Sequence, residues 1–144
     1  MKKLLAVLVV GMLIAADKGD ADKKDQDKLQ GTWSYVSLVE VDGTKMPEDQ
    51  IKKMSITFKD DTWTVKEDGK VVVEGTQKLD PSKTPHEIDS VITEGEDKGM
   101  KMLGIYELKG DTMKVSFDPQ GKNRPKDFTP KEGQFVGVIK RMKK

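Results

Sequence analysis

The stretch KLQGTWSYVSLVEVDG, residues Lys28 to Gly43, decides the fold. It begins with a polar turn, passes through Gly31-Thr32-Trp33, and continues in residues typical of a β-strand as far as the turn signal Asp42-Gly43. We therefore predict a first strand over residues 32–41, with a tryptophan near its start. The role of that tryptophan depends on what the rest of the chain places beside it.

After this strand the chain reads as a meander of short strands joined by turn signals such as Asp68-Gly69 and Gly110-Asp111. One segment breaks the pattern. Pro47 to Met54 has a proline at its start, acidic residues in its first turn and lysines in its last, which predicts a short helix. The eight predicted strands cover residues 32–41, 55–59, 62–66, 70–78, 86–94, 101–108, 112–117 and 134–141.

Two packings fit eight short antiparallel strands: a closed up-and-down barrel and a two-sheet sandwich. Sequential hairpins favour the barrel, because a sandwich usually needs long crossing connections. We predict an all-β, small, antiparallel, eight-stranded barrel with one short helix between its first and second strands. Alternation within several strands predicts the residues that face inward. These are Met54, Ile56, Phe58, Trp63, Val65, Met102, Tyr106, Leu108, Met113, Val115, Phe117, Phe135 and Ile139.

The last predicted strand carries a basic residue on its inward face. Arg141 follows Ile139 by two positions, so its side chain points to the same side, where a guanidinium is costly to bury without a partner. Closure of a barrel makes the first and last strands neighbours. We therefore predict that Arg141 lies over the indole of Trp33, a contact worth about 0.5 to 2 kcal/mol.

These residues resemble the structural signature of the calycins, the group of lipocalins, fatty-acid-binding proteins and avidins. Gly31, Trp33 and Arg141 carry that signature. More closely, the strings LQGTW, GIYELKGDTMKVSF and GKNRPKDF look like lipocalin-like domains of unknown function that recur in planctomycete bacteria. The resemblance covers about residues 26–142. It implies a barrel and usually export, and it brings no established activity. The chain departs from typical lipocalins in being shorter and in having no disulfides.

The N-terminus has the features of a secretory signal. Met1-Lys2-Lys3 is followed by an apolar run up to Ala16 that is too short to span a bilayer. Cleavage after Ala21 is favoured over cleavage after Ala16, and an uncleaved anchor is the alternative. We predict a signal peptide over residues 1–21, a charged flexible tether over 22–28 and the barrel domain over 29–142, in a protein exported to the periplasm or the exterior.

Composition excludes several classes of protein. Loss of residues 1–21 removes three of the 26 basic and two of the 25 acidic residues, which leaves 23 of each. This balance argues against nucleic acid as a partner, because such binding depends on clustered positive charge. The absence of cysteine excludes thiol catalysis, cysteine-ligated metals and disulfides. We expect a monomer with no stable membrane span after signal cleavage.

The residues that suggest chemistry are few, and we predict no catalytic residue, metal or cofactor. His86 is the only histidine and could join Glu87 and Asp89 at a metal, but a surface or packing role is commoner. The acidic clusters Asp60-Asp61 and 94–97 lack the spacing of a calcium loop and suit soluble turns. A pair of carboxylates that hydrolyses glycosides is defined by the distance between the two groups in the folded protein, so the sequence does not reveal it.

Two features point to binding. Aromatic residues make a natural lining for an apolar pocket, although small barrels are often filled by such side chains, so cavity and solid core remain alternatives. Arg124, in the long loop 118–129, either meets an anionic ligand or ties the loop to the barrel rim, and we favour the structural role. The candidate ligand contacts are Tyr35, Phe58, Trp63, Tyr106, Phe117, Phe135 and Arg124.

The sequence therefore supports three hypotheses in descending order. The first is a non-enzymatic barrel that binds a small apolar or amphipathic molecule toward Tyr35 and Tyr106, with the helix at 47–54 capping one end. The second is a solid-core envelope or interaction module that acts through its surface. The third is a hydrolase.

Overall fold

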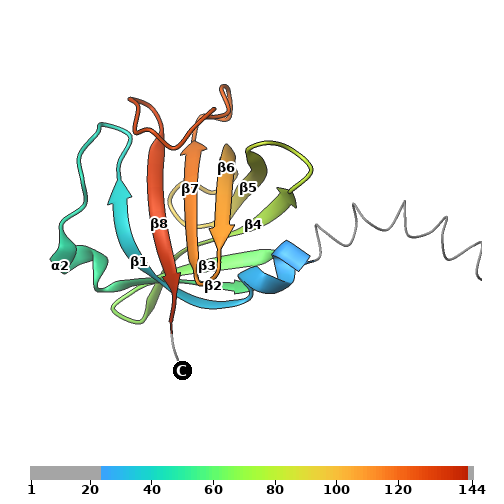
Figure 1. The fold of residues 1–144 in the computed structure, drawn as a ribbon. Coiled ribbons are helices and arrows are strands. Elements are labelled where there is room, and N and C mark those ends of the chain that lie inside the picture. Colours follow the sequence, from blue (N-terminus) through green and yellow to red (C-terminus); the bar gives the residue numbers. More distant parts are fainter. Residues whose placement is uncertain (1–23, 143–144) are drawn as a thin grey trace, which may run out of the picture.

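The computed structural model describes residues 24–142, which form a closed antiparallel β-barrel with strand order β1-β2-β3-β4-β5-β6-β7-β8 (Figure 1). The predicted barrel and its short helix between the first two strands are confirmed, and the sandwich is excluded. The elements are β1 (Gly31–Val39), α2 (Glu48–Ile51), β2 (Met54–Lys59), β3 (Thr62–Glu67), β4 (Lys70–Asp80), β5 (His86–Glu94), β6 (Lys101–Lys109), β7 (Thr112–Asp118) and β8 (Phe135–Arg141).

The first and last strands close the barrel. β1 pairs antiparallel with β8, and the register sets Trp33 opposite Arg141 and Tyr35 opposite Ile139. A bulge between Tyr35 and Ser37 shifts this register, as bulges often do where a sheet must bend sharply. Because every strand has two neighbours, the barrel has no free sheet edge.

The up-and-down order gives the barrel two distinct ends. The connections after β1, β3, β5 and β7 lie at one end, which we call the open end. The connections after β2, β4 and β6 lie at the other, the closed end, together with residues 24–30 and Met142. In Figure 1 the loops that follow β1 and β7 are at the top, and the C-terminus and the short N-terminal helix are at the bottom.

The helix between β1 and β2 is shorter than predicted. It covers Glu48–Ile51, Pro47 is its N-cap, and the chain turns through Lys52 and Lys53 into β2. Its one buried side chain is Ile51, and the helix packs against β1. Lys52 is the C-cap residue, and neither lysine lies in the last turn of the helix, where both were predicted.

The segment before β1 is helical over residues 24–29, where an unstructured charged tether was expected. Its polar composition concealed one apolar anchor, Leu29, which is fully buried. The side-chain amide Nε2 of Gln30 also donates to the backbone carbonyl oxygens of Gln26 and Asp60, at 2.9 and 3.0 Å. The predicted signal peptide, residues 1–21, lies outside the described residues.

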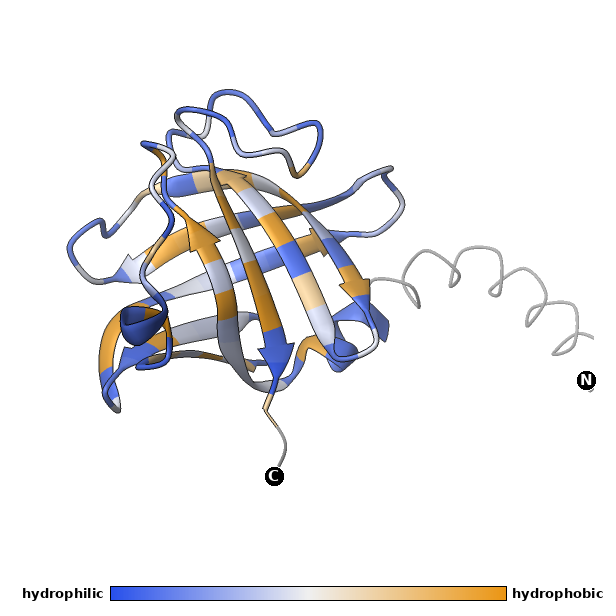
Figure 2. Ribbon diagram, turned by 60° about the vertical axis from the view of Figure 1, so that its left-hand side comes forward, coloured by the Kyte–Doolittle hydropathy of each residue, from blue (hydrophilic) through white to orange (hydrophobic). Residues whose placement is uncertain are grey.

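The core fills the barrel from the closed end upward. Apolar residues alternate along the strands with polar ones, and the connecting loops are mostly hydrophilic (Figure 2). The buried cluster is Leu29, Trp33, Phe58, Trp63, Val65, Leu79, Ile88, Ile92, Met102, Tyr106, Met113, Phe117 and Ile139.

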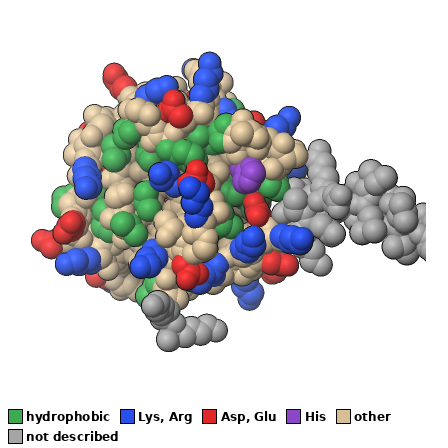
Figure 3. Space-filling model, in the orientation of Figure 1, with side chains coloured by type: hydrophobic (Ala, Val, Ile, Leu, Met, Phe, Trp, Pro, Cys, Tyr) green, Lys and Arg blue, Asp and Glu red, His purple; other side chains and the backbone are tan. Residues whose placement is uncertain are grey.

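The surface is mixed in charge, with both signs interspersed over the face seen in Figure 3. The described residues contain no helix long and apolar enough to cross a bilayer.

Candidate functional site

The barrel interior contains a cavity of about 510 Å³ that opens at the open end. Its volume lies within the range of roughly 300 to 1,000 Å³ common for small-molecule sites. The interior is therefore hollow at one end and solid at the other, which answers the choice between cavity and solid core. Side chains of all eight strands line it, and they include Tyr35, Leu38, Met54, Ile56, Phe58, Trp63, Val65, Val73, Ile88, Ser90, Ile92, Met102, Met113, Val115, Phe117, Phe135 and Ile139.

Five of the seven predicted ligand contacts lie in this lining. Tyr35, Phe58, Trp63, Phe117 and Phe135 come from five different strands and meet around one space. Alternation predicted that all of these except Tyr35 face inward, and the structure places them there. Aromatic rings supply a large contact area at little conformational cost, which suits a binding surface.

Trp63 is held in place by a hydrogen-bond network and by a glycine. Its indole Nε1 donates to Ser90 Oγ at 2.7 Å and to the carbonyl of Thr76 at 3.2 Å. The ring lies on Gly75, where a Cβ would stand 2.3 Å from Trp63 Cζ2. Any larger residue at position 75 would push the indole into the cavity, so glycine fixes the position of this wall.

Tyr35 brings a hydroxyl to a lining that is otherwise almost entirely apolar. Its ring is half-buried where it lines the cavity, and burial raises the pKa of its hydroxyl above the ordinary value. Among residues 24–142, no hydrogen-bond partner for this hydroxyl is found. A phenol in such surroundings stays neutral at physiological pH and is free to hydrogen-bond a molecule inside the barrel.

The rim of the cavity carries residues that the strand pattern did not identify. Glu40 and Val41 come from the connection after β1, and Glu96 and Asp97 come from the connection after β5. Loop residues have no periodicity that would assign them to the interior. Ser90 was also missed, although Ile88, Ser90 and Ile92 alternate along β5 in the same way as the inward faces of other strands.

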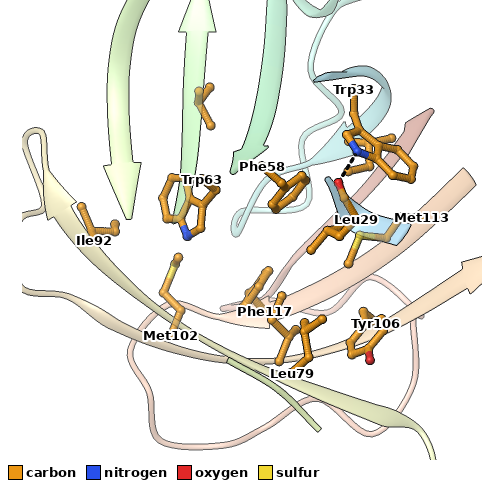
Figure 4. Packing of buried hydrophobic residues seen from close by; sticks show 13 residues of the cluster. Leu29, Trp33, Phe58, Trp63, Leu79, Ile92, Met102, Tyr106, Met113 and Phe117 are labelled. Atoms are coloured by element: carbon orange, nitrogen blue, oxygen red, sulfur yellow. Dashed lines mark hydrogen bonds between the residues drawn. The ribbon is translucent and has the colours of Figure 1, made fainter. Parts of the chain in front are cut away.

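The closed end is occupied by Trp33 and Arg141, as predicted. The guanidinium carbon of Arg141 lies 4.5 Å from the centre of the indole ring, which is itself fully buried. The indole Nε1 donates to the carbonyl of Leu29 at 2.8 Å, as the dashed line in Figure 4 shows. Arg141 also donates to the carbonyl oxygens of Gln30 and Lys28, so the last strand binds the segment that precedes the first.

Gly31 completes this signature. Its φ of +115° is a conformation that side chains rarely adopt, and a Cβ there would stand 3.3 Å from Arg141 Nη1. The residue is therefore a glycine for two reasons, backbone angle and close approach. The three predicted signature residues, Gly31, Trp33 and Arg141, form one structural unit.

Tyr106 does not line the cavity, contrary to its predicted role. It is almost fully buried near the closed end, where its hydroxyl donates to Asp25 Oδ2 at 2.6 Å. Asp25 belongs to the helix of residues 24–29, which the sequence pattern did not reveal. That helix occupies the end of the barrel toward which Tyr106 points, so the ring packs there as part of the core.

Arg124 lies outside the barrel interior, in the structural role that was favoured for it. It donates to the carbonyl of Gly104 at 2.8 Å and pairs with Asp89 at 2.7 Å and with Glu87 at 3.6 Å. The loop is further fixed by Asp118, whose carboxylate accepts backbone N–H groups of Gln120, Lys122 and Asn123. Burial opposes ionisation of Asp118, but these donors outweigh it and lower its pKa.

The residues that might have held a metal are engaged elsewhere or dispersed. Glu87 and Asp89 pair with Arg124, and the ring nitrogen Nδ1 of His86 lies 2.9 Å from the carbonyl oxygen of Lys83. Across residues 24–142, no three histidine, aspartate or glutamate side chains come together in a metal-binding arrangement.

Comparison of the chain with protein-family models, curated proteins and solved structures finds no match. The geometry of the barrel is therefore the basis for any statement about function.

Proposed function

We propose that this chain is an exported, non-enzymatic lipocalin-like barrel that binds a small apolar or amphipathic molecule in its interior. The single observation that carries the proposal is the cavity of about 510 Å³ with an almost wholly apolar lining. Water in such a space finds few hydrogen-bond partners, so an apolar molecule that replaces it gains the free energy of burial. The unpartnered Tyr35 hydroxyl supports the same reading.

Two further features support a binding role rather than catalysis. Among the described residues that line the cavity, Ser90 carries the hydroxyl best suited to act as a nucleophile. Its Oγ, however, donates to the carbonyl oxygen of Thr76 and accepts from the indole N–H of Trp63. No histidine lines the cavity to activate it. The apolar leader at residues 1–16 is the observation behind export.

The test uses a neutral fluorescent probe, N-phenyl-1-naphthylamine, titrated into the purified protein. We expect saturable binding of one probe per chain and its displacement by decanol. Val115→Phe places a larger side chain in the cavity, and we expect it to weaken probe binding at least about tenfold. Val36→Phe makes the same change at a valine that is 53% exposed on β1, and we expect it to leave binding unchanged.

Absence of saturable binding to the unmodified protein would overturn the proposal. It would favour the alternative of a module that acts through its surface. Turnover of ester or glycoside substrates that Val115→Phe abolishes would favour a hydrolase.

A further inference from the structure

We infer that the ligand is a cationic amphiphile, with its apolar tail in the cavity and its charged head among the carboxylates of the rim. This inference rests on the proposed function and adds the charge of the ligand to it. The argument depends on the distribution of ionisable groups along the cavity wall.

All the charged side chains that the described residues contribute to the lining are acidic. Glu40, Glu96 and Asp97 stand at the rim, each exposed, and come from two connections at the open end. Within the described part of the chain, none of the three takes part in an ion pair. Three unneutralised carboxylates around an apolar opening concentrate cations there and repel anions, and the field is focused by the low-dielectric wall.

The described part of the cavity lining offers no positive charge to an anionic head. Within residues 24–142, no lysine or arginine lines the cavity, so a carboxylate drawn inside would lose its hydration without gaining a counter-charge. The lining includes the aromatic rings of Trp63, Phe117 and Phe135, and the faces of such rings attract cations. The cost of burying an anion and the attraction of aromatic rings for cations therefore both favour a cationic ligand over an anionic one.

Lysine side chains also lie beside the rim, outside the cavity lining. Lys98, Lys101 and Lys122 line a shallow depression outside the rim, which shares Glu96 and Asp97 with the cavity. Lys98 also lies 3.9 Å from Glu94, which neutralises part of its charge. These cations do not line the cavity, so a head at the rim meets the carboxylates first.

The experiment compares three competitors that share one alkyl chain: decyltrimethylammonium, decanol and decanoate. Each displaces N-phenyl-1-naphthylamine from the protein at concentrations below its micelle formation. We expect the cation to compete at least about fivefold better than decanoate at low salt, with decanol between them. At about 1 M salt, where charges are screened within about 3 Å, the ratio of the two affinities should fall toward one.

A pair of charge-matched variants locates the effect. Glu96→Gln/Asp97→Asn removes two carboxylates from the rim, and we expect the cation to lose about threefold in affinity while decanol is unchanged. Asp60→Asn/Asp61→Asn removes two carboxylates from the turn between β2 and β3 at the closed end. This control should change neither competitor.

The outcomes separate the two proposals. If the probe binds and decanoate competes as well as the cation, the inference on charge is overturned and the binding function stands. If the cation wins but Glu96→Gln/Asp97→Asn has no more effect than the control, the head does not lie at the rim, and the inference is again overturned. A protein that binds none of the four molecules contradicts both proposals.

Discussion

The two tryptophans of the chain have different surroundings and different roles. Trp33 is fully buried at the closed end, with Arg141 over one face of its ring and Phe58 edge-on at 6.5 Å. Trp63 lies in the wall of the cavity, with Gly75 behind it and empty space in front. Figure 4 shows Trp33 beside Leu29 and Met113, and Trp63 beside Met102 and Ile92.

The difference shows how this small barrel divides stability from binding. The closed end joins segments that are distant in sequence, because Arg141 binds both Trp33 and the carbonyl oxygens of residues 28 and 30. The open end is made of the connections after β1, β3, β5 and β7, which surround a cavity and each join strands that follow one another in the sequence. Changes at the closed end should therefore unfold the protein, whereas changes at the open end should alter what it binds.

The largest effect is expected at Trp33. Trp33→Ala removes a fully buried ring from the point where the chain ends meet, and we expect a loss of about 3 to 5 kcal/mol in the free energy of unfolding. Val73→Ala truncates a half-buried residue of the cavity wall and should cost only about 1 kcal/mol. Urea unfolding monitored by circular dichroism measures both. Equal losses would contradict the division between the two ends.

The next effect is expected at Arg141. Arg141→Ala removes the cation over the indole and the hydrogen bonds to two carbonyl oxygens, and we expect a loss of about 1 to 3 kcal/mol. Lys140→Ala is the control, because Lys140 is exposed on the same strand. Thermal melting of both variants is the measurement. An Arg141→Ala protein that melts with the unmodified one would show that the pairing contributes nothing.

A pH dependence is expected from Tyr35 at the open end. Burial raises the pKa of its hydroxyl above the ordinary value of 10.0, so the folded state holds this proton longer than the unfolded state does. Its contribution to stability is complete below about pH 10 and is lost as pH rises above it, by at most about 1.4 kcal/mol per pH unit. Urea unfolding at a series of pH values should show this decline, and Tyr35→Phe should show less of it. The same slope in both proteins would argue against burial of the hydroxyl.

The smallest effect is expected from two buried serines. Ser116 is fully buried on β7 and its Oγ has no hydrogen-bond partner among residues 24–142, so Ser116→Ala should be neutral or stabilise by up to about 1 kcal/mol. Ser90 Oγ accepts the Trp63 indole N–H, so Ser90→Ala should destabilise by about 1 kcal/mol. Chemical unfolding of the two variants gives the signs. Destabilisation by Ser116→Ala would indicate that its hydroxyl is hydrogen-bonded.

The sequence predicts two kinds of feature: the alternation of inward and outward residues along the strands, and the pairing of Trp33 with Arg141. Alternation along the strands identifies most of the strand residues in the cavity wall, and an inward-facing arginine two residues after Ile139 identifies the partner of Trp33. Neither requires knowledge of loop paths. Both depend on barrel closure, which the run of hairpins already implies.

What the sequence could not predict depends on segments without periodicity. The helix of residues 24–29 has a charged composition, and its single apolar anchor, Leu29, gives no pattern. The position of Tyr106 depends on that helix, because Asp25 receives its hydroxyl. The acidic rim lies in loops that only the folded barrel brings together. A cavity, finally, is a volume left by packing, and no residue pattern specifies it.

The most direct test of the central claim compares the indole N–H signals of Trp33 and Trp63 in ¹⁵N–¹H correlation spectra during titration with decanol. A ligand in the cavity changes the surroundings of Trp63, while Trp33 stays enclosed at the closed end. Trp63→Phe assigns the two signals. We predict a saturable shift of the Trp63 signal with the Trp33 signal unmoved. Equal shifts, or a shift of Trp33 alone, would contradict a binding cavity above a packed closed end.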